Sequence, residues 1–189
     1  ITSGEGGMII CNDKNDYNII HTLRAHGWDR GLNNKKSNFN FINSGFNVRP
    51  SEISAAIGYN QFKRLNKFKK NRFANRNKII SSLKNSIKWK NQFTFIEADR
   101  KLKPSWFGLP ILINKKFLSK KNRFLNYLSK NGIETRPIIS GNFVNQKSIK
   151  LYNLNPDKAK FKGAQEIEDR GFFIGIHIDL ISDKKLLFI

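Results

Sequence analysis

Two polar side chains, Asn47 and Arg49, stand just before a predicted helix, where they could bind an anion. Pro50 suits the first helical position because it lacks an N–H group, and Ser51 is the alternative cap. Apolar residues recur at helical spacing from Ile53 onward. Because the N-terminus of a helix favours negative charge, an amide and a guanidinium at this place suit an anionic ligand. The alternative is an ordinary surface loop that leads into a helix.

A second polar cluster, Arg24 to Arg30, contains His26, which could act as an acid or a base because an unperturbed histidine has a pKa of about 6.5. Its position beside Gly27, at the predicted end of a helix, also fits a capping or packing role. His21 and His177 have no partners in the sequence, and no spacing typical of metal ligands occurs. We therefore predict no metal site.

The formal net charge of +21 in 189 residues raises a different class of function, a basic nucleic-acid-binding module. The lysines are dispersed, however, and the densest basic run, Lys63 to Lys78, fits the solvated face of a long helix. Asn and Ile are as over-represented as Lys, and all three have A/T-rich codons. We therefore expect no specific nucleic-acid partner.

Composition limits the compartment and the class of protein. A hydrophobic content of 39% with 16 phenylalanines indicates a folded chain. Cys11 is the single cysteine, so no internal disulfide can form, as expected for the cytoplasm. No apolar run reaches membrane-spanning length and no signal segment is present, so no membrane partner is expected. The chain has no initiator Met, and we expect it to begin inside a longer reading frame.

Predicted strands and helices alternate along the chain, which indicates an α/β fold. Met8–Cys11 is a predicted strand, and the helix that follows is capped by Asp13 and ended by Gly27. A long helix is expected from Asn66 to about Ser86. Beyond it we predict strands at 93–96, 104–113, 133–139 and 172–178, and helices from 117 to a stop at 131–132, over 164–171, and from 182 onward.

Two sequence blocks resemble signatures of one enzyme family. Residues 45–58, G-F-N-V-R-P-S-E-I-S-A-A-I-G, are similar to the pattern G-[YF]-N-x-R-x-[ST]-E-[IM]-x-A-A-x-G, and residues 1–8, I-T-S-G-E-G-G-M, to I-T-[TS]-G-E-G-G-M. Both patterns are typical of the sugar-nucleotide aminotransferases called the DegT/DnrJ/EryC1/StrS family. The whole chain resembles the C-terminal half of that family.

The resemblance implies a fold. The chain would be the C-terminal portion of a fold-type-I transferase that depends on pyridoxal 5′-phosphate (PLP). Residues 1–65 would form the end of the PLP-binding large domain, residues 66–91 a bridging helix, and residues 92–189 a small α/β domain.

The resemblance also implies a cofactor, PLP or pyridoxamine 5′-phosphate, and residues that contact it. Asn47 would reach the PLP phosphate of the partner subunit, and Gly4 and Glu5 would have a positional role beside the cofactor. Arg49 would bind a phosphate or carboxylate of the substrate. The family's Schiff-base lysine lies about two residues before the first motif, hence before Ile1, so no catalytic residue is expected within the chain.

The loop from Glu134 to Phe143 departs from the H-Y-x-P-x-H-like pattern of ordinary aminotransferases of the family. It is similar to the x-T-R-x-x-x-x-G-N-x-x-x-Q loop of the CDP-4-keto-6-deoxyglucose 3-dehydrases, in which histidine replaces the lysine. Arg136, Gly141 and Asn142 would then face a sugar nucleotide. The alternative is a strand end followed by a Gly-Asn turn.

These resemblances favour a PLP-dependent aminotransferase that acts on a nucleotide-linked keto-deoxysugar in lipopolysaccharide, O-antigen or other deoxysugar biosynthesis. Glutamate would be the amino donor, and the chain alone would be a fragment without the Schiff-base lysine. A 3-dehydrase-like dehydratase is the close alternative. The full protein is expected to be a homodimer with active sites shared across its interface.

Overall fold

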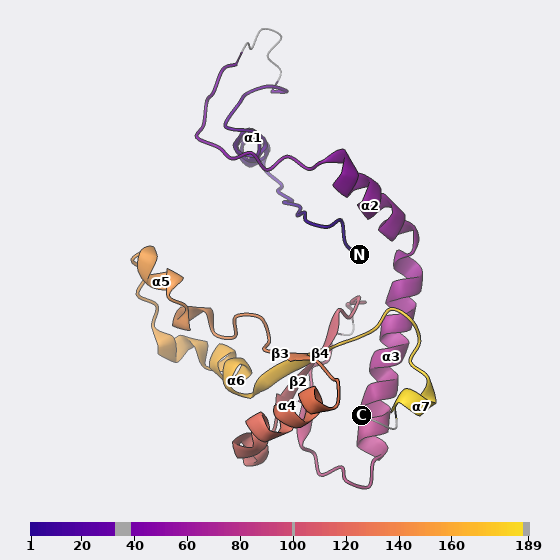
Figure 1. The fold of residues 1–189 in the computed structure, drawn as a ribbon. Coiled ribbons are helices and arrows are strands. Elements are labelled where there is room, and N and C mark those ends of the chain that lie inside the picture. The colour runs from indigo at the N-terminus through magenta and orange to yellow at the C-terminus, as the bar shows by residue number, and fades with distance from the viewer. Residues whose placement is uncertain (33–38, 100, 187–189) are drawn as a thin grey trace. The chain divides into compact units, whose positions relative to one another are not determined.

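The computed structural model describes residues 1–32, 39–99 and 101–186, and the chain divides into two compact units. Unit 1 is Ile1–Leu65 and unit 2 is Asn66–Ile189 (Figure 1). In the described part of the chain, no helix combines the length and the hydrophobicity that crossing a bilayer requires.

Unit 1 contains the helices α1 (Lys14–Leu23) and α2 (Glu52–Lys63). Asp13 caps α1, as predicted, because its carboxylate accepts hydrogen bonds from two backbone N–H groups at 2.7 and 3.0 Å. Ser51 caps α2 by accepting from the N–H three residues further on, at 3.2 Å. Pro50 therefore lies just outside the helix, and the second of the two alternatives for this helix start is correct.

The predicted strand at Met8–Cys11 is wrong. These residues lie outside any strand, and the apolar side chains of Met8, Ile9 and Ile10 are 71% to 86% exposed. A strand needs a neighbour to pair its backbone N–H and C=O groups. The described part of unit 1 forms isolated bridges only, and neither includes this run. Pairing with another strand of unit 1 therefore does not explain why this run is apolar.

The described part of unit 1 has almost no apolar interior. In its described part the buried residues are Thr22, Gly27 and Asp29, and none of them is a large apolar residue. Phe46 and Ile53, by contrast, are 70% and 75% exposed. Hydrogen bonds between loops hold the described part of the unit, and Trp28 adds ring contacts with Phe39 and Phe41.

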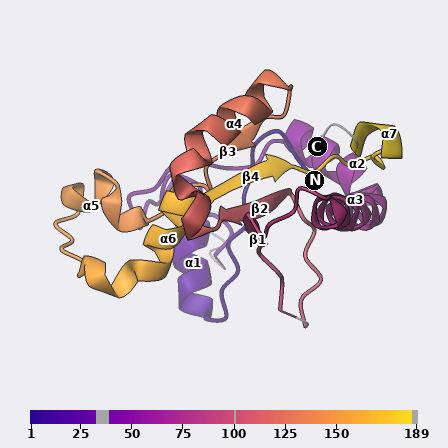
Figure 2. The same ribbon diagram turned by 90° about the horizontal axis from the view of Figure 1, so that it is seen from below.

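Unit 2 is built on a four-stranded sheet in the order β1–β2–β4–β3, in which every neighbouring pair is antiparallel. The helix α4 (Lys121–Lys130) connects β2 to β3, which run in the same direction, and β4 inserts between them. This split βαβ arrangement explains how alternating strands and helices give an antiparallel sheet. In Figures 1 and 2, α4 lies next to β3. The strands are β1 (Phe93–Phe95), β2 (Gly108–Ile113), β3 (Thr135–Arg136) and β4 (Gly171–Gly175).

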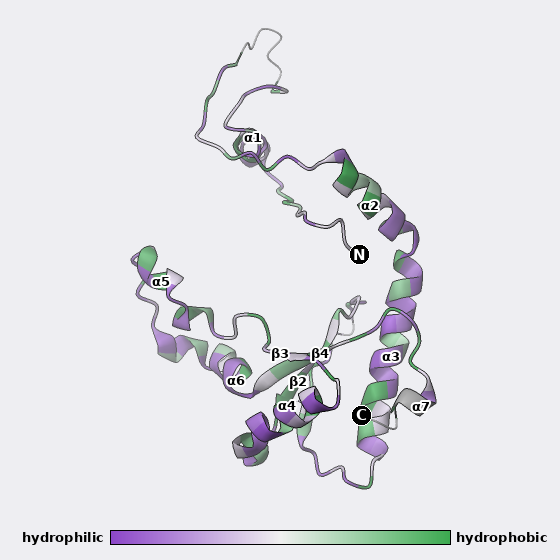
Figure 3. Cartoon of the chain, viewed as in Figure 1, coloured by the Kyte–Doolittle hydropathy of each residue, from purple (hydrophilic) through white to green (hydrophobic). Residues whose placement is uncertain are grey.

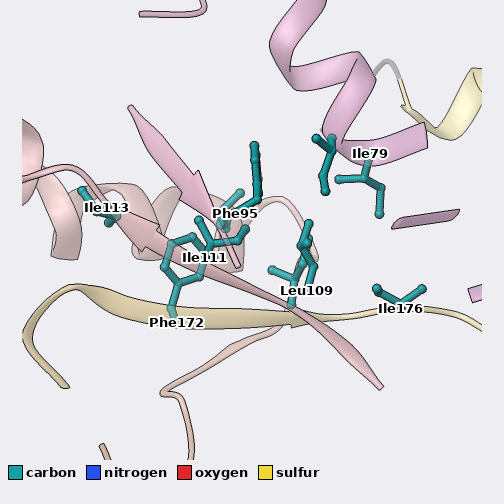
Figure 4. Packing of buried hydrophobic residues seen from close by; sticks show 10 residues of the cluster. Ile79, Phe95, Leu109, Ile111, Ile113, Phe172 and Ile176 are labelled. Carbon is teal, nitrogen blue, oxygen red and sulfur yellow. The ribbon is translucent and has the colours of Figure 1, made fainter. Parts of the chain in front are cut away.

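The core of unit 2 lies between the sheet, α4 and the long helix α3 (Leu65–Asn85). Burial alternates along β2, so Leu109, Ile111 and Ile113 share the face that is covered. Ile79 of α3 and Phe172 of β4 join them, each 1% exposed. Figure 4 shows this cluster, and Figure 3 shows hydrophobic and hydrophilic residues alternating along α3 and α4. One face of each helix therefore packs on the core.

The predicted long helix is confirmed, but the strand predicted at 133–139 is reduced to Thr135–Arg136. Pro137 has no N–H to donate to a ladder, and Ile139 has φ +46°, which is incompatible with a strand. Several short elements between the predicted ones escaped prediction, namely η2 (Phe143–Asn145), α5 (Ser148–Leu151) and η3 (Lys158–Phe161). The last helices are α6 (Lys162–Arg170) and α7 (Asp183–Leu186), where helices were predicted; residues 187–189 lie outside the described chain.

Polar contacts connect α6 to α4 and to η1 (Lys115–Lys120), the 3₁₀ helix that precedes α4. Glu166 of α6 lies 2.6 Å from the Lys115 Nζ and also pairs with Arg170. Hydrogen bonds from these two cations lower the pKa of the Glu166 carboxyl. Lys121 donates to the backbone C=O of Asp169 at 2.7 Å, and burial lowers the pKa of this amine. The start of α4 is therefore fixed against α6.

Candidate functional site

The segment that carries Asn47 is held against the end of α1 by its backbone. Phe46 donates to the carbonyl of Leu23 at 2.7 Å and accepts from the N–H of His26 at 2.8 Å. Asn47, the next residue, forms an isolated antiparallel bridge with Ala25. The loop before α2 is therefore fixed by the turn after α1, although the two are about twenty residues apart in sequence.

Two glycines make this close approach possible. Gly27 has φ +83°, and a Cβ there would lie 1.6 Å from the backbone oxygen of Asn43. A Cβ on Gly45 would lie 2.4 Å from the backbone nitrogen of Gly27. The side chain of Asn43 also donates to the buried hydroxyl of Thr22 at 2.7 Å. Neither glycine position has space for a side chain.

The side chains of Asn47 and Arg49 are exposed and available to a ligand. Within the described residues, neither side chain has a hydrogen-bond or ion-pair partner. Both precede the Ser51 cap of α2 by only a few residues. The amide offers two N–H donors and the guanidinium five, which is the chemistry that a phosphate or a carboxylate requires. The chemistry of these donors fits the phosphate of a cofactor.

Gly4 and Glu5 lie in a turn that belongs to the same unit. The N–H of Gly4 donates to the Thr2 hydroxyl at 3.1 Å, and the Ser3 hydroxyl donates to the carbonyl of Glu5 at 3.0 Å. A Cβ on Gly58 of α2 would lie 3.5 Å from the Cβ of Ser3. The motif of residues 1–8 and that of residues 45–58 are therefore in contact, through Ser3 and α2.

The remaining candidates belong to unit 2. Arg136, in β3, is exposed, and its Nε donates to the Glu134 carboxylate at 2.8 Å. The two terminal nitrogens of its guanidinium have no partner among the described residues. Arg136 can therefore bind a further anion without leaving Glu134.

Gly141 and Asn142 are used inside the protein. Asn142 is 2% exposed; its backbone N–H donates to Glu168 at 2.7 Å, and its side-chain amide donates to Gln165 at 3.0 Å. Its side-chain oxygen caps η2. Gly141 has φ +60°, and a Cβ there would lie 2.8 Å from the side chain of Glu168. These contacts favour the Gly-Asn turn interpretation: the pair seats its loop on α6.

The sequence did not predict the residues that form hydrogen bonds with these loops. Gln165 and Glu168 lie more than twenty residues beyond Asn142, and Thr22 lies 21 residues before Asn43. No spacing signal marks such pairs. His26, weighed as an acid or base, has an exposed side chain and φ +63°, and the loop uses its backbone N–H. No group of three His, Cys, Asp or Glu in the described chain is placed to hold a metal.

Curated relatives match most of this chain. GDP-4-keto-6-deoxy-D-mannose 3-dehydratase from Yersinia pseudotuberculosis is 32% identical over 100% of this chain and 50% of its own length. The enzyme of the same name from Escherichia coli O55:H7 is 30% identical over 94% of this chain and 47% of its own. A Campylobacter jejuni UDP-4-amino-4,6-dideoxy-N-acetyl-beta-L-altrosamine transaminase is 29% identical over 70% of this chain and 34% of its own. The chain spans about half the length of the two dehydratases.

Solved structures show the same fold. The E. coli GDP-4-keto-6-deoxy-D-mannose-3-dehydratase with bound hydrated PLP superposes with a TM-score of 0.75 at 28% identity, over 93% of this chain and 47% of that one. The Helicobacter pylori aminotransferase PseC gives a TM-score of 0.71 at 24% identity, over 93% and 44%, which shows the fold alone. The predicted fold class, the C-terminal portion of a fold-type-I PLP-dependent transferase, is confirmed. Because the family profile matches residues 1–185, the chain belongs to the DegT/DnrJ/EryC1/StrS aminotransferase family.

Proposed function

We propose that the full-length gene product is a PLP-dependent 3-dehydratase of a nucleotide-linked 4-keto-6-deoxysugar. The observation that carries this choice is the sequence alignment: two 3-dehydratases are 32% and 30% identical over 100% and 94% of the chain, whereas the transaminase is 29% identical over 70%. This reverses the order that the motifs favoured, in which aminotransfer came first. The loop of residues 134–143, similar to that of 3-dehydrases, supports the same choice.

The cofactor of the proposed enzyme is PLP or pyridoxamine 5′-phosphate, which when bound supplies the electron sink for breaking a bond next to the keto group. Asn47 donates to the cofactor phosphate of a partner subunit, while Gly4 and Glu5 shape the turn next to the cofactor. We propose that the family's Schiff-base lysine, or a histidine in its place, precedes Ile1 in the full-length protein. This chain then binds and orients, and the preceding segment performs the proton transfers.

Arg49 and Arg136 are the proposed contacts to the substrate. Each presents exposed guanidinium nitrogens without a protein partner in the described chain, which suits the phosphates of a nucleotide sugar or the carboxylate of glutamate. Gly141 and Asn142 affect substrate binding indirectly, because they hold the loop that follows β3 against α6. The substrate contacts and the loop support are thus separate tasks.

The proposed assembly is a homodimer, and its support is that the described part of unit 1 has almost no apolar interior. The described part of that unit buries no large apolar side chain, while Met8, Ile10, Phe46 and Ile53 are 70% to 86% exposed. Exposed apolar side chains in such number are typical of a surface that contacts other protein. A partner subunit and the remainder of the polypeptide would provide that contact. A cytoplasmic location is proposed with it, and Cys11 is free there.

The reaction is tested by mass spectrometry of the sugar. Full-length protein is incubated with PLP, glutamate and GDP-4-keto-6-deoxy-D-mannose. Loss of the C3 hydroxyl is the expected result. A sugar that returns unchanged from enzyme with bound PLP would contradict the proposed reaction.

Aminotransfer is the second candidate, because a transaminase is among the relatives that this chain resembles. The same incubation separates the two. Gain of an amino group at C4 with release of 2-oxoglutarate would establish aminotransfer in place of dehydration.

Asn47→Ala in the full-length protein should weaken PLP binding by roughly 10-fold to 150-fold, because a hydrogen bond to a charged acceptor contributes about 1.5–3 kcal/mol. The change in affinity is measured by equilibrium dialysis with absorbance of the released cofactor. Asn15→Ala, an exposed position on α1, is the matched control and should leave PLP affinity unchanged. Equal affinities of the two variants would remove Asn47 from the cofactor site.

A further inference from the structure

Unit 2 contains a cavity of about 370 Å³ between the η1–α4 segment and the sheet edge formed by β1 and the end of β2. Its walls are mainly aromatic: Phe93 comes from β1, Phe117 from η1, and Phe124 and Tyr127 from α4. The volume lies within the range of about 300–1,000 Å³ that is usual for small-molecule sites. None of the residues assigned above to cofactor or substrate lines it.

The aromatic walls continue into the core. The rings of Phe93 and Phe124 are 5.1 Å apart, and both contact Phe172, at 6.4 and 6.0 Å between ring centres. Phe172 is 1% exposed, so the floor of the cavity rests on packed core residues. Tyr127 is 63% exposed at the rim. A planar ring can enter from the rim and contact ring faces and edges inside.

Two cations stand at the cavity, and no acidic residue lines it. Lys120 and Arg123 are exposed, three residues apart at the start of α4, and among the described residues neither has an ion-pair or hydrogen-bond partner. Their neighbours Lys115 and Lys121, by contrast, are paired with α6. The free cations therefore coincide with the aromatic cavity, and the charge at its entrance is positive.

The cavity is held open by contacts on both sides. On one side η1 and α4 are fixed to α6 through Lys115 and Lys121. On the other, Asn114 joins the strands, because its N–H donates to the carbonyl of Gln92 at 2.9 Å and its side-chain oxygen accepts from the Thr94 hydroxyl at 3.0 Å. The walls are thus set before any ligand arrives, which lowers the entropic cost of binding.

We propose that this cavity binds a small aromatic carboxylate, with its ring between Phe93, Phe117 and Phe124 and its carboxylate toward Lys120 and Arg123. A nucleotide fits less well, because a base needs hydrogen-bond partners for its edges. The one amide in the lining, Gln92, already donates to Lys88 and accepts from Lys90, both at 2.8 Å. An aromatic ring without polar edges can pack against the aromatic side chains of the walls, and one anionic group can pair with the two cations.

The test uses the full-length protein saturated with PLP, so that the cofactor site is filled, and isothermal titration calorimetry with 2-naphthoate and its neutral analogue 2-naphthamide. We expect one site per chain, with naphthoate bound at least 10-fold more tightly than naphthamide. Arg123→Glu should weaken naphthoate binding at least 10-fold. Lys130→Glu makes the same charge change at the exposed end of α4, outside the lining, and should alter affinity less than 2-fold.

Four outcomes would overturn the proposal. Equal affinity for naphthoate and naphthamide would show that the cations do not contribute, and equal losses in Arg123→Glu and Lys130→Glu would show a general charge effect. Absence of saturable binding to the wild-type protein would show that the cavity does not bind an aromatic carboxylate. Adenosine monophosphate is titrated as well, and tighter binding of it than of naphthoate would replace the carboxylate with a nucleotide. Because these readouts do not involve turnover, they are independent of the proposed dehydration.

Discussion

Gly27→Ala should disrupt the loop that carries Asn47 and abolish stable cofactor binding in the full-length protein. At φ +83° a residue with a Cβ is strained by about 1–2 kcal/mol. The added Cβ would also lie 1.6 Å from the backbone oxygen of Asn43, and neither atom can move away by a side-chain rotation. The loop must therefore shift, which breaks the pairing of Phe46 and Asn47 with the end of α1. The measurements are PLP retention on gel filtration and the thermal unfolding temperature.

Gly132→Ala is the control for backbone strain without overlap. Gly132 has φ +77°, but a Cβ there would meet no atom within 4 Å. We expect it to cost about 1–2 kcal/mol of stability and to leave PLP retention unchanged. If the two variants lose stability equally and both retain PLP, the contact between Gly27 and Asn43 does not position the cofactor loop.

Local chemistry made the helices of this fold predictable. Asp13 and Ser51 mark their helices because a cap depends on residues within one turn. The predicted end of α1 at Gly27 is wrong, because the helix stops at Leu23. Gly27 instead allows the backbone of Asn43 to approach closely. That second role depends on a contact 16 residues away, which no local pattern reports.

Strands were predictable only where their partners are inside the chain. Phe172 and Ile111 pair within unit 2, and both of their strands were anticipated. Met8–Cys11 has the composition of a strand without a partner in the described part of unit 1. β-structure depends on a neighbour, so composition alone cannot establish it.

The candidate site shows the same limit. Exposed donors such as Asn47 and Arg49 follow from the motif and from their place before a helix. Asn142 carries the same amide group, yet it is buried and bonded to Gln165. An amide in a Gly-Asn turn can face a ligand or face its own protein, and only the position of α6 decides between the two.

Limited trypsin digestion of residues 1–189 expressed alone should remove unit 1 and leave a resistant fragment that begins near Asn66. Arginine and lysine occur throughout both units, so trypsin can cut either one. Unit 2 has a core that includes Ile79, Leu109 and Phe172, whereas the described part of unit 1 buries no large apolar residue. Proteolysis follows the population of the open state, which apolar burial suppresses. The fragments are identified by mass spectrometry over a time course.

Leu109→Ala tests whether that core is the cause of the resistance. Leu109 is 0% exposed, and its truncation should destabilise unit 2 by about 2–5 kcal/mol, which raises the open population by roughly 30-fold or more. Leu151→Ala, the same change at a position 81% exposed in α5, should remain within about 0.5 kcal/mol of the parent chain. Equal digestion rates for the two variants, or protection of unit 1 to the same degree as unit 2 in the parent chain, would contradict this assignment of stability. Among the described residues the apolar core lies in unit 2, and the proposed partner surface would provide the apolar cover for unit 1.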